Sequence, residues 1–213
     1  MPNPRACHED TSREDNSHEK LPEFNIRSLR YYIARTVSTC WHCGSPTALV
    51  ALAVPPGHET LDVDDDASNE DSGDGAAHRG PPASTWSVAD HNAFLFYVES
   101  LTTAVRERIK QCQPAYRPLD ADAAAVPGTA PATALVSASA EGGGSDSYWA
   151  NHCEKCGCQL DDHELFCEPE GGFLPTSASA AAAIHLVPVD EPFEAAAAGY
   201  SYEPPFFNAM IRR

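Results

Sequence analysis

The sequence predicts a mostly β or α+β fold made of two cysteine-tipped β-hairpins, one helix and long insertions. Three observations support this prediction. Two segments, CWHCG at 40–44 and CEKCG at 153–157, share the same spacing, and strand-like apolar runs precede both. Residues 100–111 carry apolar side chains at helical spacing. Stretches of small, proline and acidic residues separate these elements, and such stretches lack the bulky side chains that build a core.

The composition along the chain predicts one domain over residues 27–213, preceded by a disordered arm over residues 1–26. The arm is polar and charged, and it has no apolar periodicity. Residues 57–83 hold an acidic block, and residues 121–145 are mainly Ala, Gly, Pro and Ser. Neither stretch buries enough apolar surface to offset the entropy lost on ordering. We therefore expect a flexible acidic insert and a linker.

The first half of the predicted domain begins with a β-hairpin. Residues 28–36 are rich in aromatic and β-branched side chains, which favour a strand. Residues 47–54 form a second apolar run, which ends at two prolines. The CWHCG segment lies between them and would form the tip. After the insert we expect a strand at 94–98 and then the helix at 100–111.

The second half repeats the pattern of strand, cysteine turn and strand. Residues 147–153 are strand-like and lead into the CEKCG segment, and residues 164–167 would form the returning strand. Residues 184–189 are expected to form one more strand. The alanine-rich residues 191–199 are expected to form a short helix.

Four cysteines are predicted to hold one metal ion. Two cysteines three positions apart direct their sulfurs at one ion when the backbone between them turns tightly. A glycine follows the second cysteine of each pair, and glycine permits the positive φ that such a turn needs. Four thiolates are the usual ligand set of a closed structural zinc site. The predicted ligands are Cys40, Cys43, Cys153 and Cys156.

The paired motifs resemble the zinc-ribbon family, in which two knuckle-tipped hairpins clasp one ion. The resemblance covers about residues 29–54 and 147–167, and it implies a structural Zn²⁺ with no catalytic residue at the metal. A departure from compact ribbons is the 109-residue separation between Cys43 and Cys153. This separation is compatible with one shared site because the cost of closing a loop grows only logarithmically with its length.

The charge and the cysteine content indicate the compartment and the class of partner. The formal net charge is −17, which disfavours nucleic-acid binding because that depends on clustered Lys and Arg. No apolar run approaches the roughly 20 residues of a membrane helix. We therefore expect a cytoplasmic protein with a protein partner and no membrane association. In a reducing cytoplasm, eight cysteines indicate metal binding or redox chemistry rather than a disulfide framework.

The predicted function is a recognition or interaction module with a structural metal and no catalytic residues, because four thiolates leave no open position for a substrate. Two alternatives remain. The carboxylates and His163 within residues 161–170 would suit general acid–base chemistry, which would make the protein an enzyme on a ribbon scaffold. Iron would make the four-cysteine site that of a rubredoxin-like electron carrier.

Other cysteines and histidines are weaker candidates for the metal. Four of them neighbour the predicted ligands or follow them closely in the sequence: His42, His152, Cys158 and Cys167. Cys7, in the arm, and Cys112, at the end of the expected helix, are interpreted as incidental thiols.

Overall fold

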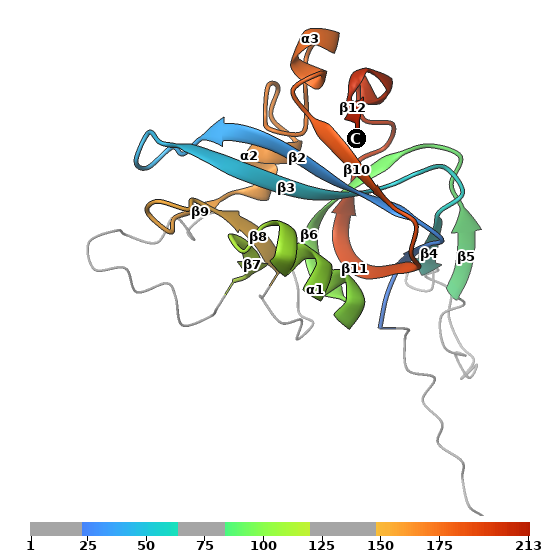
Figure 1. Cartoon of the computed structure of the whole chain (residues 1–213). Helices are drawn as coiled ribbons and strands as arrows, with labels where there is room; N and C mark the ends of the chain where they lie inside the picture. Colours follow the sequence, from blue (N-terminus) through green and yellow to red (C-terminus); the bar gives the residue numbers. More distant parts are fainter. Residues whose placement is uncertain (1–22, 64–83, 120–147) are drawn as a thin grey trace, which may run out of the picture.

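The computed structural model describes residues 23–63, 84–119 and 148–213, and these form one large mixed β-sheet with three short helices (Figure 1). The mostly β prediction is confirmed. The strands are β1 (Ile26–Ser28), β2 (Tyr31–Thr39), β3 (Pro46–Val54), β4 (Glu59–Val63), β5 (Ser84–Val88), β6 (Ala93–Leu101), β7 (Tyr116–Pro118), β8 (Trp149–His152), β9 (Gln159–Leu160), β10 (His185–Val189), β11 (Phe193–Tyr200) and β12 (Ile211–Arg212). The helices are α1 (Thr103–Cys112), α2 (Asp162–Phe166) and α3 (Ala178–Ala181), and a 3-10 turn, η2, spans Phe207–Ala209.

The main path of the sheet runs β12–β10–β2–β3–β6–β11–β1–β4–β5. Strands β10 and β12 pair in parallel, and the other described pairs are antiparallel. The three strands β7, β8 and β9 extend the sheet from one side, where β8 pairs with β6. The long strands β2 and β3 therefore lie near the centre, with the extension beside them (Figure 1).

Strand β3 separates two hydrophobic cores. It is buried continuously from Leu49 to Val54, as expected of a strand covered on both faces. Val50 and Leu52 pack into the core that also holds the apolar side of α1, with Val105 and Ile109. Leu49 and the two alanines at 51 and 53 face the other core, which includes Cys40 and Cys153. The predicted ligands thus extend from a packed core.

Two hairpins form, each with a cysteine turn at its tip, but only the first has both of the strands predicted for it. In the first, β2 pairs with β3 from Tyr32 opposite Ala53 to Thr39 opposite Pro46. In the second, β8 pairs with the two-residue strand β9. The returning strand expected at 164–167 is wrong, because these residues belong to α2 and its end. The Asp161 side chain accepts a hydrogen bond from the His163 N–H and starts a helix there.

The helix expected at 191–199 is also wrong, because these residues lie in β11 and the turn before it. The strand pairs with β1 on one side and with β6 on the other. Packing requires a glycine at one position of this strand, because a Cβ added at Gly199 would lie 2.1 Å from the ring of Phe96 on β6. The position of the segment between two strands therefore overrides the helix propensity of its alanines.

The remaining predicted elements are placed with modest shifts. Strands β2, β3, β6 and β10 correspond to the strands expected at 28–36, 47–54, 94–98 and 184–189, and α1 corresponds to the expected helix. Within the range expected as an acidic insert, Glu59–Val63 forms β4. The rest of that insert up to residue 83, the linker at 121–145 and the first 22 residues of the arm lie outside the described residues.

Candidate metal centre

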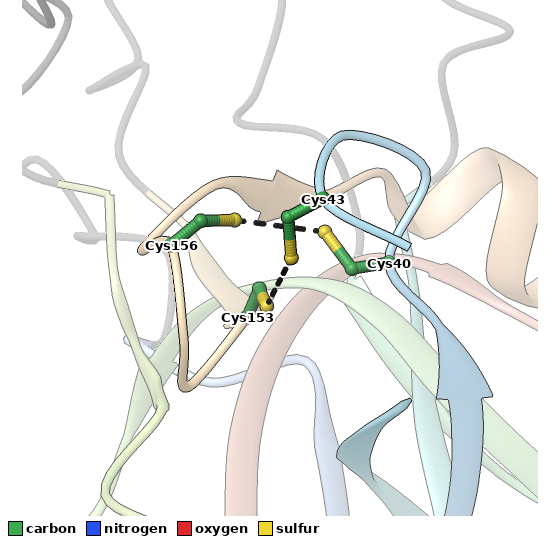
Figure 2. Close-up of side chains that lie close together, drawn as sticks. All are labelled: Cys40, Cys43, Cys153 and Cys156. Atoms are coloured by element: carbon green, nitrogen blue, oxygen red, sulfur yellow. Dashed lines mark hydrogen bonds between the residues drawn. The ribbon is translucent and has the colours of Figure 1, made fainter. Parts of the chain in front are cut away.

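The four predicted ligands converge from the two hairpin tips (Figure 2). The Sγ atoms of Cys40 and Cys156 lie 3.7 Å apart, and those of Cys43 and Cys153 also lie 3.7 Å apart. All four Sγ atoms lie within 4.8 Å of one another. These residues, far apart in the sequence, therefore form one group, which we call the four-cysteine cluster.

The spacing of the sulfurs fits a tetrahedral metal ion. With a zinc–sulfur bond of about 2.3 Å, the edge of a regular tetrahedron of sulfurs measures about 3.8 Å. A disulfide would require about 2.05 Å, and all four cysteines are free. The four-cysteine cluster is therefore suited to one four-coordinate ion that accepts thiolates.

The first cysteine turn, residues 40–45, is shaped by two backbone hydrogen bonds. The N–H of Gly44 donates to the carbonyl of Cys40, and the N–H of Cys40 donates to the carbonyl of Ser45, each over 2.9 Å. Gly44 adopts a φ of +66°, a conformation that side chains with a Cβ rarely take. We call this segment the first knuckle.

The second cysteine turn, residues 153–158, has the same bonds and the same special glycine. The N–H of Gly157 donates to the carbonyl of Cys153, and the N–H of Cys153 donates to the carbonyl of Cys158, each over 2.8 Å. Gly157 has a φ of +73°. This segment is the second knuckle, and the glycine signal in the sequence correctly predicted both.

A buried asparagine joins the two hairpins beneath the knuckles. The side chain of Asn151, on β8, accepts a hydrogen bond from the Val50 N–H over 2.8 Å and donates one to the Val50 carbonyl over 2.9 Å. The pairing of β3 with β6 begins only at Leu52, so β6 does not reach Val50. The Asn151 side chain makes the hydrogen bonds to Val50 that a neighbouring strand would otherwise make. This role of Asn151 was not predicted from the sequence, because it depends on a contact with a distant strand.

Two further bonds connect the knuckle regions directly. The Glu154 N–H donates to the hydroxyl of Thr47 over 3.3 Å. The indole N–H of Trp41 donates to the carbonyl of Gln159 over 3.2 Å. The relative position of the two knuckles is therefore fixed by protein contacts as well as by the four-cysteine cluster.

The thiols of the first knuckle differ in their electrostatic surroundings. Burial raises the pKa of Cys40 to about 11. A hydrogen bond from the Ser45 side chain lowers the pKa of Cys43 to about 6. Because a metal binds the thiolate, uptake of an ion by this cluster releases protons and acid opposes it.

Only some of the weaker candidate ligands lie in a group of possible metal ligands. His42 and Cys158 join Cys156 in a second group whose donor atoms lie within 4.8 Å of one another. Cys167, at the end of α2, and Cys112, at the end of α1, belong to no metal-ligand group within the described residues. His152 also lies outside both groups, and its Nδ1 is 3.0 Å from the Ala150 carbonyl. Cys7 lies outside the described residues.

The acidic segment at 161–170 has structural contacts of its own. Asp161 caps α2, and His163 lies 3.6 Å from Glu168 at the surface. Asp162 is buried, and its carboxylate accepts a hydrogen bond from the Tyr97 N–H over 2.7 Å. Tyr97 has a φ of +50°, so Asp162 stabilises an uncommon backbone conformation in β6. Within the described residues this segment gathers no metal-ligand group.

Asp162 predicts a pH dependence of stability. Burial raises its pKa to about 7, against the opposing hydrogen bond from Tyr97; in an unfolded chain the value is about 3.9. At pH values between these two pKa values, Asp162 is protonated more in the folded protein than in the unfolded chain. Rising pH therefore reduces stability until the carboxyl group is ionised in both states. The Asp162→Asn side chain does not titrate, so its free energy of unfolding lacks this pH dependence. Between pH 4 and pH 8 the free energy of unfolding of the variant should therefore rise relative to that of the wild type by up to about 4 kcal/mol in total.

Urea unfolding of both proteins at several pH values, at one saturating zinc concentration, measures this difference. The comparison cancels the acid sensitivity of the four-cysteine cluster, which both proteins share. A difference that stays constant between pH 5 and pH 8 would show that Asp162 is ionised throughout this range.

Comparisons with family models, curated proteins and solved structures give no match to this chain. Within the described residues, no helix has the length and hydropathy needed to cross a bilayer. The knuckle pattern and the geometry of the four-cysteine cluster are therefore the observations from which the function must be argued.

Proposed function

We propose that this chain is a cytoplasmic zinc-binding protein in which a structural Zn²⁺ at the four-cysteine cluster holds the two hairpins together and supports a protein-recognition surface. The observation that carries the proposal is the geometry of the cluster. Four thiolates within 4.8 Å of one another can fill every coordination position of zinc, which is typical of structural rather than catalytic sites.

The position of the cluster supports a structural role for the ion. It lies between hairpins that are distant in the sequence, and the second hairpin has only two paired residues on its returning strand. Such a short hairpin is not stable by itself. Structural zinc contributes roughly 10–16 kcal/mol of apparent binding free energy, which is enough to fix it.

The surface beside the first knuckle supports a role in recognition. Trp41 is 60% exposed and Val37 is 65% exposed, although both are large apolar residues. The indole of Trp41 is anchored by its bond to Gln159, so the ring is presented with little loss of side-chain entropy on binding. Exposed tryptophans are common hot spots of protein interfaces. The acidic net charge favours a basic protein as the partner.

The identity of the metal is tested on purified full-length chain prepared without added metal. We expect one tightly bound zinc per chain by elemental analysis and a colourless solution. A ferric tetrathiolate absorbs visible light, so a red protein that contains iron would contradict the zinc assignment. It would instead support the rubredoxin-like alternative.

The recognition role is tested by cross-linking tagged protein in its own cells, followed by affinity purification. Trp41→Ala is expected to reduce recovery of a specific partner at least tenfold while the zinc is retained. Tyr202→Ala is the matched control, because Tyr202 is 71% exposed and belongs to the segment after β11. Equal recovery with all three proteins would contradict recognition through the first knuckle.

A further inference from the structure

The two knuckles are related by an approximate two-fold exchange. Exchanging them maps Cys40 onto Cys153 and Cys43 onto Cys156. The Cys40–Cys156 pair then becomes the Cys153–Cys43 pair, and both pairs have a separation of 3.7 Å. The backbone bonds within the knuckles correspond in the same way, at 2.9 Å in the first and 2.8 Å in the second. The two knuckles and these two sulfur pairs therefore follow an approximate two-fold symmetry.

The side chains around the cluster break this symmetry on one side. The residue after the glycine is Ser45 in the first knuckle and Cys158 in the second. The third position is His42 in the first knuckle and Lys155 in the second. One side of the cluster consequently has a thiol and an imidazole, where the opposite side has a hydroxyl and an ammonium group.

The side with the thiol and the imidazole holds a second set of possible metal-ligand atoms. The ring nitrogen of His42 and the sulfurs of Cys156 and Cys158 all lie within 4.8 Å of one another. His42 and Cys156 are exposed and Cys158 is half-buried, so an ion in solution has access to this group.

We propose that His42, Cys156 and Cys158 form a second metal position for a thiophilic divalent ion such as Zn²⁺ or Cd²⁺, with Cys156 bridging both ions. This position goes beyond the structural zinc of the proposed function. Its three protein ligands leave a fourth position for water, unlike the closed four-cysteine cluster.

The chemistry of the first site favours the second ion. A Zn²⁺ with four thiolates carries a net charge of −2, which attracts another cation at short distance. The Cys156 thiolate retains lone pairs that a second ion accepts, and two thiolates with one imidazole suit zinc and cadmium. Binding forms the bond to the Cys158 sulfur and releases the thiol proton to solvent. No electron transfer is involved.

Native mass spectrometry of the full chain, with increasing Zn²⁺, tests the proposal. We expect one ion at equimolar zinc and a second ion in excess zinc. His42→Ala and Cys158→Ser should each keep the first ion and weaken the second step by more than the roughly 10–100-fold that loss of an outer-shell partner costs. Cys158→Ser gives the second knuckle the residue that the first already has, so its fold should be retained.

The approximate symmetry supplies a gain-of-site variant. Ser45→Cys combined with Lys155→His should create the symmetry-related position, with Cys43 as the bridge, and a third ion should bind. Cys167→Ser is the control for non-specific thiols and should still bind two ions. The proposal is overturned if the wild type never exceeds one ion, or if the second ion persists in both loss variants. A wild type that fails to bind even the first ion would instead contradict the proposed function.

Discussion

Cys40→Ser should lose the tightly bound metal, and the two hairpins should separate at 25 °C. Cys40 is a buried member of the four-cysteine cluster, so its loss leaves three thiolates and places a weak hydroxyl ligand in a packed core. Domains of this size are stable by about 5–15 kcal/mol. Loss of most of the roughly 10–16 kcal/mol from structural zinc would be comparable with that whole margin. This is the largest effect that we expect from one substitution.

Elemental analysis and circular dichroism of the purified variant measure this effect. The near-ultraviolet signal is informative because Trp149, on β8, packs in the core and Trp41 lies on the first knuckle. Cys167→Ser is the matched control, because Cys167 is an exposed thiol outside both metal-ligand groups. A Cys40→Ser variant with a full equivalent of zinc and a wild-type spectrum would show that the four cysteines do not share one ion.

Asn151→Ala should destabilise the protein by about 2–6 kcal/mol. The substitution removes both bonds to Val50, whose N–H and carbonyl then lie buried without a partner from β8. Each such group costs about 1–3 kcal/mol. Because Asn151 lies two residues before the second knuckle, its loss should also speed the release of zinc to a chelator. Urea unfolding and the rate of zinc transfer measure the two effects.

Asn25→Ala is a close control for this prediction. The side chain of Asn25 makes the same pair of bonds, to the N–H and carbonyl of Ala197 on β11, over 3.0 and 2.9 Å. It is only partly buried, so the stability loss should be smaller. It lies outside the metal-ligand groups, so zinc transfer should be unchanged. Equal acceleration of zinc release by both variants would indicate a global loss of stability rather than a local role for Asn151.

The four-cysteine cluster was predictable from the sequence because the geometry of each cysteine turn is local. The cysteine spacing and the glycine with positive φ define each knuckle within a single short turn. The pairing of the knuckles followed from the number of ligands that zinc needs. The strands β2 and β3 were predictable for a related reason, since each has a continuous apolar or β-branched run.

The wrong predictions concern segments whose structure depends on other contacts. The alanine-rich residues 191–199 have helix propensity, yet strands β1 and β6 supply partners on both sides. Residues 164–167 were expected to form a strand, but Asp161 caps α2, which covers most of this segment. The role of Asn151 depends on the length of β6, which ends its pairing with β3 at Leu52. A single sequence gives no access to such pairings.

The separation of the two knuckles has a consequence for synthesis of the chain. At about 5–20 residues per second, the ribosome needs roughly 5–20 s to add the residues between Cys43 and Cys153. During that interval the first knuckle offers only half of a metal site. The edge of β3 at Val50 also lacks the asparagine that later occupies it. The nascent hairpin thus presents an open strand edge to neighbouring chains, and it is protected only when the second knuckle emerges.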